Sequence, residues 1–361
     1  MGGVSMEWKE DVLGSVLEVK YGKDHKKLAD GQYPVYGSGG LMRYVDSKLY
    51  DGPSILIPRK GTLNNIMFVE SPFWTVDTMF WSIINTDKVD PKFLFYSICK
   101  RDFASMNVGS AVPSMTVNIL NDIQISYPKN IEDQRRIASI LSSLDRKIEL
   151  NNKINADLEE MAQAIFKNWF VDFEPFKDGN FVDSELGMIP EGWKVGTLED
   201  LITIKYGKDH KKLEDGTFPV YGSGGLMRFV NSWLYNGESV LIPRKGTLDN
   251  IMYVCEKFWT VDTMFFSVPK MDYVMKYVYN YIKRFDFSKM NEGTSVPSNT
   301  AARLNKMQIL IPTHEVLEMY DETLCPIYNK RKMNDKESRT LSLLRDTLLP
   351  RLMSGELEVP E

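Results

Sequence analysis

The sequence predicts an α+β protein built from two similar globular domains and two long helices. The first observation is an internal repeat: residues 21–80 recur as residues 206–265 without a gap, and 46 of the 60 aligned positions are identical. The second observation is a long polar segment with heptad-spaced apolar residues after each repeat. A repeat this long exceeds the roughly 20–50 residues of a solenoid unit, so it indicates two whole domains of one design.

These observations divide the chain into four segments: a globular domain over 1–130, a helix over 131–172, a linker with the second domain over 173–312, and a second helix over 313–361. Within each domain, Gly, Pro, Asn and Asp clusters separate short β-branched and aromatic runs such as SILIP and FWTV. That pattern is typical of short strands joined by long turns.

Both long segments have the spacing of a coiled coil, with asparagine at some of the core-facing positions. In the first helix the positions are Ile137, Leu141, Leu144, Ile148, Asn151, Asn155, Leu158, Ala162, Ile165 and Trp169. In the second they are Leu317, Tyr320, Leu324, Ile327, Asn334, Leu341, Leu344 and Leu348. We expect the helices to pack on each other as rods of roughly 50–60 Å. The alternative is two amphipathic helices, each lying on its own domain.

The composition is that of a globular protein, with 26% charged and 43% hydrophobic residues. No run of 18 apolar residues exists, which excludes a transmembrane helix, and the start MGGVSMEW lacks the features of a signal peptide. The three cysteines are widely scattered, so we expect reduced thiols and a cytoplasmic location. A net charge of −5 does not favour nucleic acid, but Lys and Arg gather in the repeats.

The first candidate binding residues lie in turns that are the same in both copies. KYGKDHKK places a basic cluster beside an aromatic residue and precedes the glycine-rich YGSGG, and exposed backbone N–H groups near lysines suit phosphate contact. The candidates are Tyr21, Lys23, His25, Lys26, Lys27, Tyr36, Ser38, Gly39 and Arg43, and, in the second copy, Tyr206, Lys208, His210, Lys211, Lys212, Tyr221, Ser223, Gly224 and Arg228. The alternative is a solvated face. No GK[ST] follows YGSGG, which excludes a P-loop.

Two further turns add candidates. PRKGT places Arg at a turn, where its guanidinium can bind guanine O6 and N7; its residues are Arg59, Lys60 and Thr62, with Arg244, Lys245 and Thr247. GSAVPSMT and GTSVPSNT offer hydroxyl and N–H donors through Ser110, Ser114, Thr294 and Ser298. The alternatives are a solvent-exposed hairpin and a helix N-cap at Ser114 or Ser298. FWTVDTMF predicts a core strand, with Asp77 and Thr78 pointing outward or capping a turn.

Catalytic patterns are missing. His25 and His210 recur, but no Cys or second His recurs with them to form a metal site or a nucleophile–base pair. The sequence has no GxxxxGK[ST], no PDxExK and no NPPY-like loop. We therefore expect a binding protein without a metal or cofactor of its own.

Four motifs resemble the DNA specificity subunits of type I restriction–modification systems. They are IPEGWK (189–194), GSAVPSMT (109–116), EDQRRIASILSSLDRKIELN (132–151) and LLPRLMSGEL (348–357). The resemblance covers nearly the whole chain. It implies two target-recognition domains held apart by two antiparallel helices in a pseudo-twofold arrangement. It also implies that the helices dock two methyltransferase subunits, which bind S-adenosylmethionine, and restriction subunits where these exist.

Members of that family usually have two different recognition domains, whereas this chain has near-twins. We therefore expect the target to be an interrupted palindrome, because a twofold protein meets the same half-site on opposite strands. Half-site centres are expected about one helical turn apart, roughly 10 bp, or somewhat more. Two other classes remain open: a single-chain restriction and methylation enzyme, and an adaptor with duplicated domains that does not bind DNA.

Overall fold

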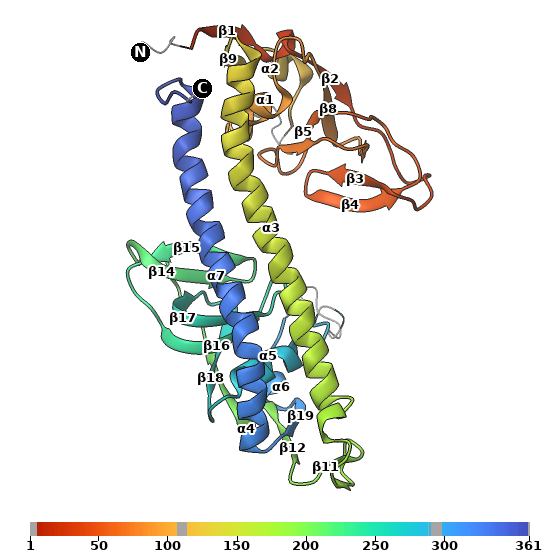
Figure 1. Ribbon diagram of the computed structural model, residues 1–361, viewed down its shortest axis with the longest axis vertical. Helices are drawn as coiled ribbons and strands as arrows, with labels where there is room; N and C mark the ends of the chain where they lie inside the picture. The colour runs from red at the N-terminus through yellow and green to blue at the C-terminus, as the bar shows by residue number, and fades with distance from the viewer. Residues whose placement is uncertain (1–5, 107–113, 288, 290–297, 360–361) are drawn as a thin grey trace. The chain divides into compact units, whose positions relative to one another are not determined.

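The computed structural model describes residues 6–106, 114–287, 289 and 298–359, and it has the predicted α+β composition (Figure 1). The chain forms two compact units. Unit 1 comprises Met1–Asn151 and Asp335–Glu361, and unit 2 comprises Asn152–Asn334. Each unit has its own apolar core and contains one copy of the repeat. No helix among the described residues is long and apolar enough to cross a membrane.

The globular part of unit 1 contains three small sheets. Strands β1 (Trp8–Val12) and β9 (Gln124–Pro128) pair antiparallel. A four-stranded sheet has the order β2 (Leu17–Tyr21), β8 (Met79–Ile84), β5 (Ser54–Pro58), β6 (Met67–Val69). A three-stranded sheet has the order β4 (Gly40–Val45), β3 (Tyr33–Gly37), β7 (Trp74–Thr75). The short helices are η1 (Leu13–Ser15), α1 (Pro91–Ile98) and α2 (Val117–Asn121).

Unit 2 repeats this plan with longer strands. Here β12 (Lys194–Thr197) pairs with β19 (Gln308–Ile311), and β10 (Phe181–Val182) pairs with β11 (Ile189–Pro190). A six-stranded sheet has the order β13 (Ile202–Tyr206), β18 (Met264–Pro269), β16 (Tyr235–Pro243), β17 (Met252–Thr260), β14 (Asp215–Gly222), β15 (Gly225–Val230). The short helices are η2 (Glu174–Phe176), α4 (Leu198–Leu201), α5 (Met275–Ile282) and α6 (Ala301–Asn305).

Two prolines explain why one copy has two sheets where the other has one. In unit 2, Glu238 and Lys257 lie within β16 and β17, which pair continuously from Tyr235 to Leu241. The equivalent residues of unit 1 are Pro53 and Pro72. Proline has no N–H to donate to a β ladder, so the corresponding strand divides into β6 and β7.

Two 40-residue helices, α3 (Ile131–Phe170) and α7 (His314–Met353), each contribute one half to each unit. In unit 1 the amide of Asn151 donates to Glu337 at 2.8 Å, and Arg345 binds Asp145 at 2.6 Å. In unit 2 the amide of Asn334 donates to Asn155 at 2.8 Å. The residue numbers rise along one helix as they fall along the other, so within each unit the helices run antiparallel, as predicted.

The helices also belong to the domain cores, so both interpretations of the heptad pattern hold. Ile137 and Leu141 are fully buried in the core of unit 1, and Leu317 and Tyr320 in that of unit 2. The predicted seam asparagines Asn151 and Asn334 are 1% exposed. Leu344, predicted in the seam, is 44% exposed. That prediction was wrong because the apolar stripe of a straight helix drifts relative to a strict heptad.

The two units contain equivalent elements in the same order, but unit 1 is formed from two separate segments, the beginning and the end of the chain. The unit boundaries fall after Asn151 in α3 and after Asn334 in α7, so the first half of α3 corresponds to the first half of α7. Unit 2 is one continuous segment. Unit 1 joins the last residues of the chain to the first: a Cβ on Gly355 would lie 2.6 Å from Nε1 of Trp8.

Candidate functional site

The basic loop after β2 is held by backbone contacts that only glycine permits. The N–H of Gly22 donates to Met79 at 2.9 Å, and a Cβ at Gly22 would lie 2.0 Å from the carbonyl oxygen of Val76. The indole of Trp74 then donates to the carbonyl of Lys23 at 2.9 Å. The side chains of the loop lysines are exposed in both copies: Lys23, Lys26, Lys27, Lys208, Lys211 and Lys212.

An aspartate turn shapes the same loop. The N–H of Lys26 donates to the carboxylate of Asp24 at 3.0 Å, and this bond lowers the pKa of Asp24. Asp209 and Lys211 make the same contact at 3.0 Å in unit 2. The Nδ1 atoms of His25 and His210 are buried and have no hydrogen-bond partner among the described residues. The loop therefore has one conformation in both copies, and its lysines point outward.

The YGSGG hairpin and the PRKGT turn meet at a glycine. Gly61 has φ +89°, and a Cβ there would lie 2.8 Å from the hydroxyl of Ser38. The amide of Asn65 donates to the carbonyl of Ser38 at 2.8 Å. Gly246, Ser223 and Asn250 repeat this arrangement in unit 2, with a hydrogen bond of 2.9 Å. The hairpin tip at Gly39 and Gly224 is open, with no atom within 4 Å of a Cβ placed at either residue.

Arginine and tyrosine stack at the edge of this assembly. The guanidinium of Arg59 lies 5.5 Å from the ring centroid of Tyr21, and that of Arg244 lies 5.6 Å from the ring of Tyr206. Both tyrosines are more than half exposed. The ring restricts the guanidinium, so Arg59 and Arg244 would lose little conformational freedom on binding a ligand.

The last predicted loop joins the assembly at Ser114 and Ser298. Lys60 forms a β-bridge with Ser114, and Lys245 forms one with Ser298. Thr62 and Thr247 lie exposed in the adjoining turns. The alternative role of the serines as N-caps was wrong, because Thr116 and Thr300 accept the capping hydrogen bonds of α2 and α6. Ser110 and Thr294 lie outside the described residues.

The arginines and tyrosines predicted to contact a ligand from the hairpin instead bind or pack against residues of their own unit. Arg43 donates to the carbonyl of Leu28 and to the carboxylate of Asp30, both at 2.9 Å, and thereby ties the basic loop to β4. Arg228 binds the carbonyl of Leu213 in the same way. Tyr221 is 5% exposed and its hydroxyl donates to Glu256, while Tyr36 is half-buried. Side-chain packing, which the sequence does not reveal, removes these residues from the exposed set.

The structure adds residues that the sequence reasoning did not assign to the site. In unit 2 the basic loop, the hairpin and the turn before β18 surround a hollow of about 610 Å³, lined by Met227, Asp262 and Thr263 together with predicted residues. Apolar side chains of β15 are exposed in the same unit: Leu226, Met227 and Phe229. The equivalent side chains of β4 in unit 1 are also exposed: Leu41, Met42 and Tyr44. One feature of the sequence could have identified these residues: the segments LMR and VDT are identical in the two copies.

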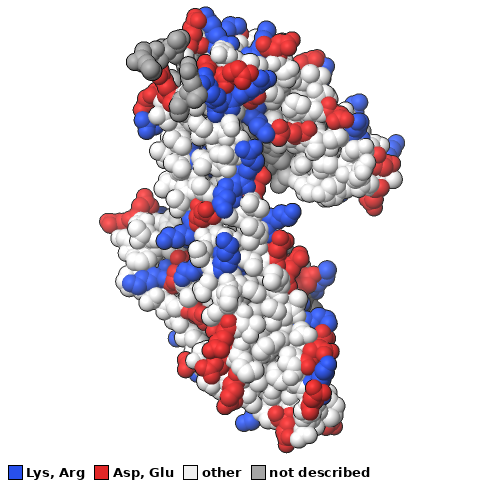
Figure 2. Space-filling model, in the orientation of Figure 1, with Lys and Arg blue, Asp and Glu red and all other residues white. Residues whose placement is uncertain are grey.

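Charge on the surface is mixed. On the face that Figure 2 shows, Lys and Arg side chains alternate with Asp and Glu over both units. A surface of this kind does not attract a polyanion through its overall field. Any nucleic-acid contact therefore depends on local clusters such as the basic loops.

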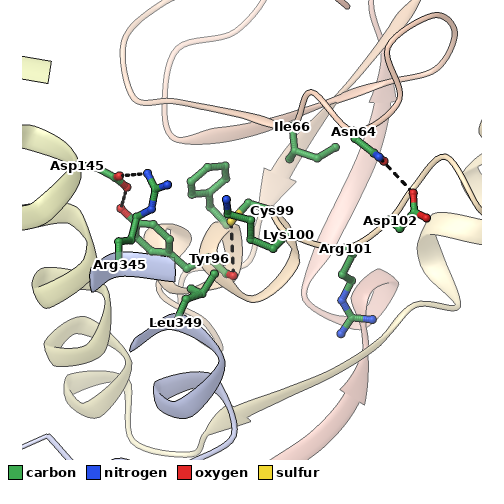
Figure 3. A pocket seen from close by; sticks show the side chains of 11 residues that line it. Asn64, Ile66, Tyr96, Cys99, Lys100, Arg101, Asp102, Asp145, Arg345 and Leu349 are labelled. Carbon is green, nitrogen blue, oxygen red and sulfur yellow. Dashed lines mark hydrogen bonds and ion pairs between the residues drawn. The ribbon is translucent and has the colours of Figure 1, made fainter. Parts of the chain in front are cut away.

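A separate cavity of unit 1 lies between α1 and the long helices (Figure 3). The hydroxyl of Tyr96 donates to Asp145 at 2.5 Å, and the guanidinium of Arg345 binds the same carboxylate at 2.6 Å. Lys100 pairs with Asp346 at 3.2 Å. Tyr96 and Lys100 thus connect α1 and the turn after it to both long helices. Among the described residues, no group of three or more His, Cys, Asp or Glu side chains could hold a metal ion.

Cys99, which lines this cavity, is expected to be a slow nucleophile. Burial raises the pKa of its thiol to about 11. At pH 8 only about one thiol in a thousand is then the reactive thiolate, and the alkylation rate should rise tenfold per pH unit up to about pH 11. Iodoacetamide labelling of a C255S/C325S variant, followed by mass spectrometry, measures this profile. A rate that levels off near pH 8.5 would show an unperturbed thiol.

Comparisons with known proteins agree with this architecture. Residues 6–160 and 190–322 match the family described as the type I restriction modification DNA specificity domain. The type I restriction enzyme MjaIX specificity subunit of Methanocaldococcus jannaschii is 27% identical over 384 residues, which cover 93% of this chain and 86% of that protein. The HindI specificity subunit of Haemophilus influenzae is 22% identical, with coverage of 81% and 83%.

The fold has a counterpart among solved structures. The crystal structure of a type I restriction–modification S subunit from M. genitalium aligns with a TM-score of 0.61 at 18% sequence identity, covering 96% of each chain. At this identity the match supports the fold alone. The family match, by contrast, spans well over half of the sequence. The chain therefore belongs to the type I restriction modification DNA specificity family.

Proposed function

We propose that this specificity subunit binds double-stranded DNA through its two recognition domains and directs partner methyltransferase subunits to a bipartite target. The observation that carries the proposal is the repeated loop assembly. In both units a basic loop, a glycine hairpin and an arginine turn converge through the same contacts. Exposed lysines and stacked arginines suit phosphate and base contacts respectively.

Two identical reading surfaces imply two identical half-sites. The recognition loops recur without a substitution in GKDHKK, YGSGG and PRKGT. If the two units bind one duplex, each reads the same base sequence, and a twofold arrangement places the second half-site on the opposite strand. The target is then an interrupted palindrome. This chain holds no cofactor in the proposal, because the methyltransferase binds S-adenosylmethionine.

The long helices present repeated apolar positions for a partner. Leu150 on α3 and Met333 on α7 are equivalent positions, 50% and 66% exposed, and so are Met161 and Leu344, 53% and 44% exposed. Exposed large apolar side chains on helices suit protein contacts. Two copies of one methyltransferase would each meet one apolar side chain, Leu or Met, at each of these equivalent positions. Restriction subunits would join the same complex where they are present.

Mapping of modified adenines tests the target. The chain is co-expressed with its methyltransferase in cells that lack other adenine methylation, and the DNA is sequenced for N6-methyladenine. The expected result is one interrupted palindrome with the modified adenines in equivalent positions on the two strands. Two unrelated half-sites would show that the diverged segments 82–105 and 267–289, and not the shared turns, read the bases.

A salt titration separates DNA binding from an adaptor role. The logarithm of the affinity of the complex for a target duplex should fall linearly with the logarithm of salt concentration, by about 0.9 for each phosphate contact. An affinity that does not change with salt would contradict the proposed interface with DNA.

A further inference from the structure

The residues that line the hollow between the recognition loops of unit 2 differ less between the two copies of the repeat than the residues around them. Ten residues line it in unit 2, among them His210, Ser223, Met227, Val261, Asp262 and Thr263. All ten recur as the same residue type in the first copy, so the 14 substitutions between the two 60-residue copies all fall elsewhere. Several of these residues are exposed, where folding alone tolerates change. Their identity indicates that the hollow of unit 2 and the equivalent residues of unit 1 bind a common ligand.

One carboxylate that lines the hollow, that of Asp262, and its equivalent Asp77 in unit 1 have no hydrogen-bond or ion-pair partner among the described residues. Both side chains are exposed. The backbone beside them is fixed, because the carbonyl of Asp77 accepts from Arg59 and that of Thr78 accepts from the N–H of Arg59. Asp262 thus lines the same hollow as Lys211 of the basic loop without forming an ion pair with it.

An unpaired carboxylate is unfavourable next to phosphate, because like charges repel. On a DNA-binding surface it is favourable only opposite a hydrogen-bond donor of a base. The major groove offers two such donors, the 4-amino group of cytosine and the 6-amino group of adenine. Adenine also presents the acceptor N7 beside its amino group, which repels the second carboxylate oxygen. Cytosine has no acceptor at that edge, so it is the better match.

We propose that Asp77 and Asp262 each accept a hydrogen bond from the 4-amino group of one cytosine in each DNA half-site. The inference rests on the proposed function and names the chemical group that the hollow recognises. Met227 lines the same hollow as Asp262 and offers apolar contact to the C5 edge of the same pyrimidine, and Met42 is its equivalent in unit 1. These residues thereby determine sequence specificity, while the neighbouring lysines contact phosphate.

The test compares base preference in the complex of the full chain with its methyltransferase. Wild type, an Asp77→Ala/Asp262→Ala variant and an Asp77→Asn/Asp262→Asn variant are each used to select duplexes from a randomised pool. The alanine variant should lose its preference at one cytosine per half-site, by roughly 5- to 100-fold, and should bind random duplex as tightly as wild type or more tightly. Asparagine pairs with adenine N6 and N7, so that variant should shift the preference from cytosine towards adenine.

The matched control is Asp87→Ala with Asp272→Ala. These exposed carboxylates occupy equivalent positions in the turns after β8 and β18, whereas Asp77 and Asp262 precede those strands. Removing the same charge there should leave base preference unchanged. A second readout uses duplexes in which one cytosine is replaced by a pyrimidine without the 4-amino group. Wild type should lose roughly 5- to 100-fold in affinity at one position per half-site, and the alanine variant should lose nothing there.

The outcomes separate this inference from the function on which it rests. A wild-type complex that selects a defined target while both aspartate variants select the same bases would overturn the cytosine contact and leave DNA recognition intact. A selected half-site without any cytosine on either strand would also overturn it. A wild-type complex that selects no sequence and shows no salt dependence would overturn the proposed function itself.

Discussion

Replacing both Arg59 and Arg244 with alanine is expected to weaken specific DNA binding by about 2–6 kcal/mol, which is roughly 30-fold to 20,000-fold. Each guanidinium lies over a tyrosine ring, 5.5 or 5.6 Å from its centroid. A bidentate contact to guanine is worth about 1–3 kcal/mol. The two residues belong to different units, so their effects should add. Fluorescence anisotropy with the target duplex and with a scrambled duplex measures the difference.

The control for this experiment is Arg135→Ala, which removes the same charge from the surface of α3. Arg135 is exposed and pairs with Glu132 on the same helix, so its loss should change specific binding by less than about threefold. Equal losses of R59A/R244A on the target and the scrambled duplex would reassign the two arginines to phosphate contact. Each single arginine variant should show about half of the free-energy loss.

Lys276→Ala is expected to destabilise unit 2 by about 3–5 kcal/mol. Lys276 is 3% exposed and binds Asp321 at 2.7 Å and Glu238 at 3.1 Å. Burial lowers its pKa, but the two carboxylates more than compensate and hold the pKa above its ordinary value. Without the ammonium group, Asp321 remains as a buried charge with no cation beside it. Hydrogen exchange of the α5 segment, followed by mass spectrometry, measures the local loss.

The chain supplies a matched control for Lys276. Lys92 occupies the equivalent position on α1, but it is partly exposed and pairs with the exposed Glu70. Lys92→Ala should therefore cost less than about 1 kcal/mol. In unit 1 the position of Asp321 is taken by the buried Ala138, so Lys276→Met with Asp321→Ala should recover most of the lost stability. Equal effects of the two lysine variants would contradict the role of the buried pair.

The two long helices show which structural features the heptad pattern predicts and which it does not. The buried asparagines Asn151 and Asn334 follow from the heptads, because a polar residue at a heptad position of an apolar stripe faces the partner helix. The exposure of Leu344 does not follow from them. Its position depends on which side of α7 the domain covers, and that is decided by contacts with residues far away in the sequence. The heptads also do not reveal that Phe166 and Phe170 of α3 enter the core of unit 2.

The recognition loops show the same limit. The repeated turns identify Lys23, Arg59 and Ser38, because exposed residues rarely stay identical without a common role. They also identify Arg43, which lies on β4 and binds the backbone of the basic loop. An arginine that binds a base and an arginine that stabilises a loop cannot be distinguished from the sequence, because both are identical in the two copies. Conversely, the sequence pattern predicts only a turn or outward position for Asp77, whereas the structure places its equivalent Asp262 in the hollow of unit 2.

The sequence by itself determined that the protein has two domains of one design, two long helices and repeated basic turns, since each of these is a pattern along the chain. Only the tertiary structure decided which turns meet. Residues 22–26, 37–42 and 76–78 are far apart in sequence, and they form one surface because β3 pairs in parallel with β7 while β2 pairs with β8. Strand pairing between distant segments depends on the whole core. In unit 2 the equivalent pairings, β14 with β17 and β13 with β18, bring Asp262, Met227 and His210 to one hollow, which local pattern does not encode.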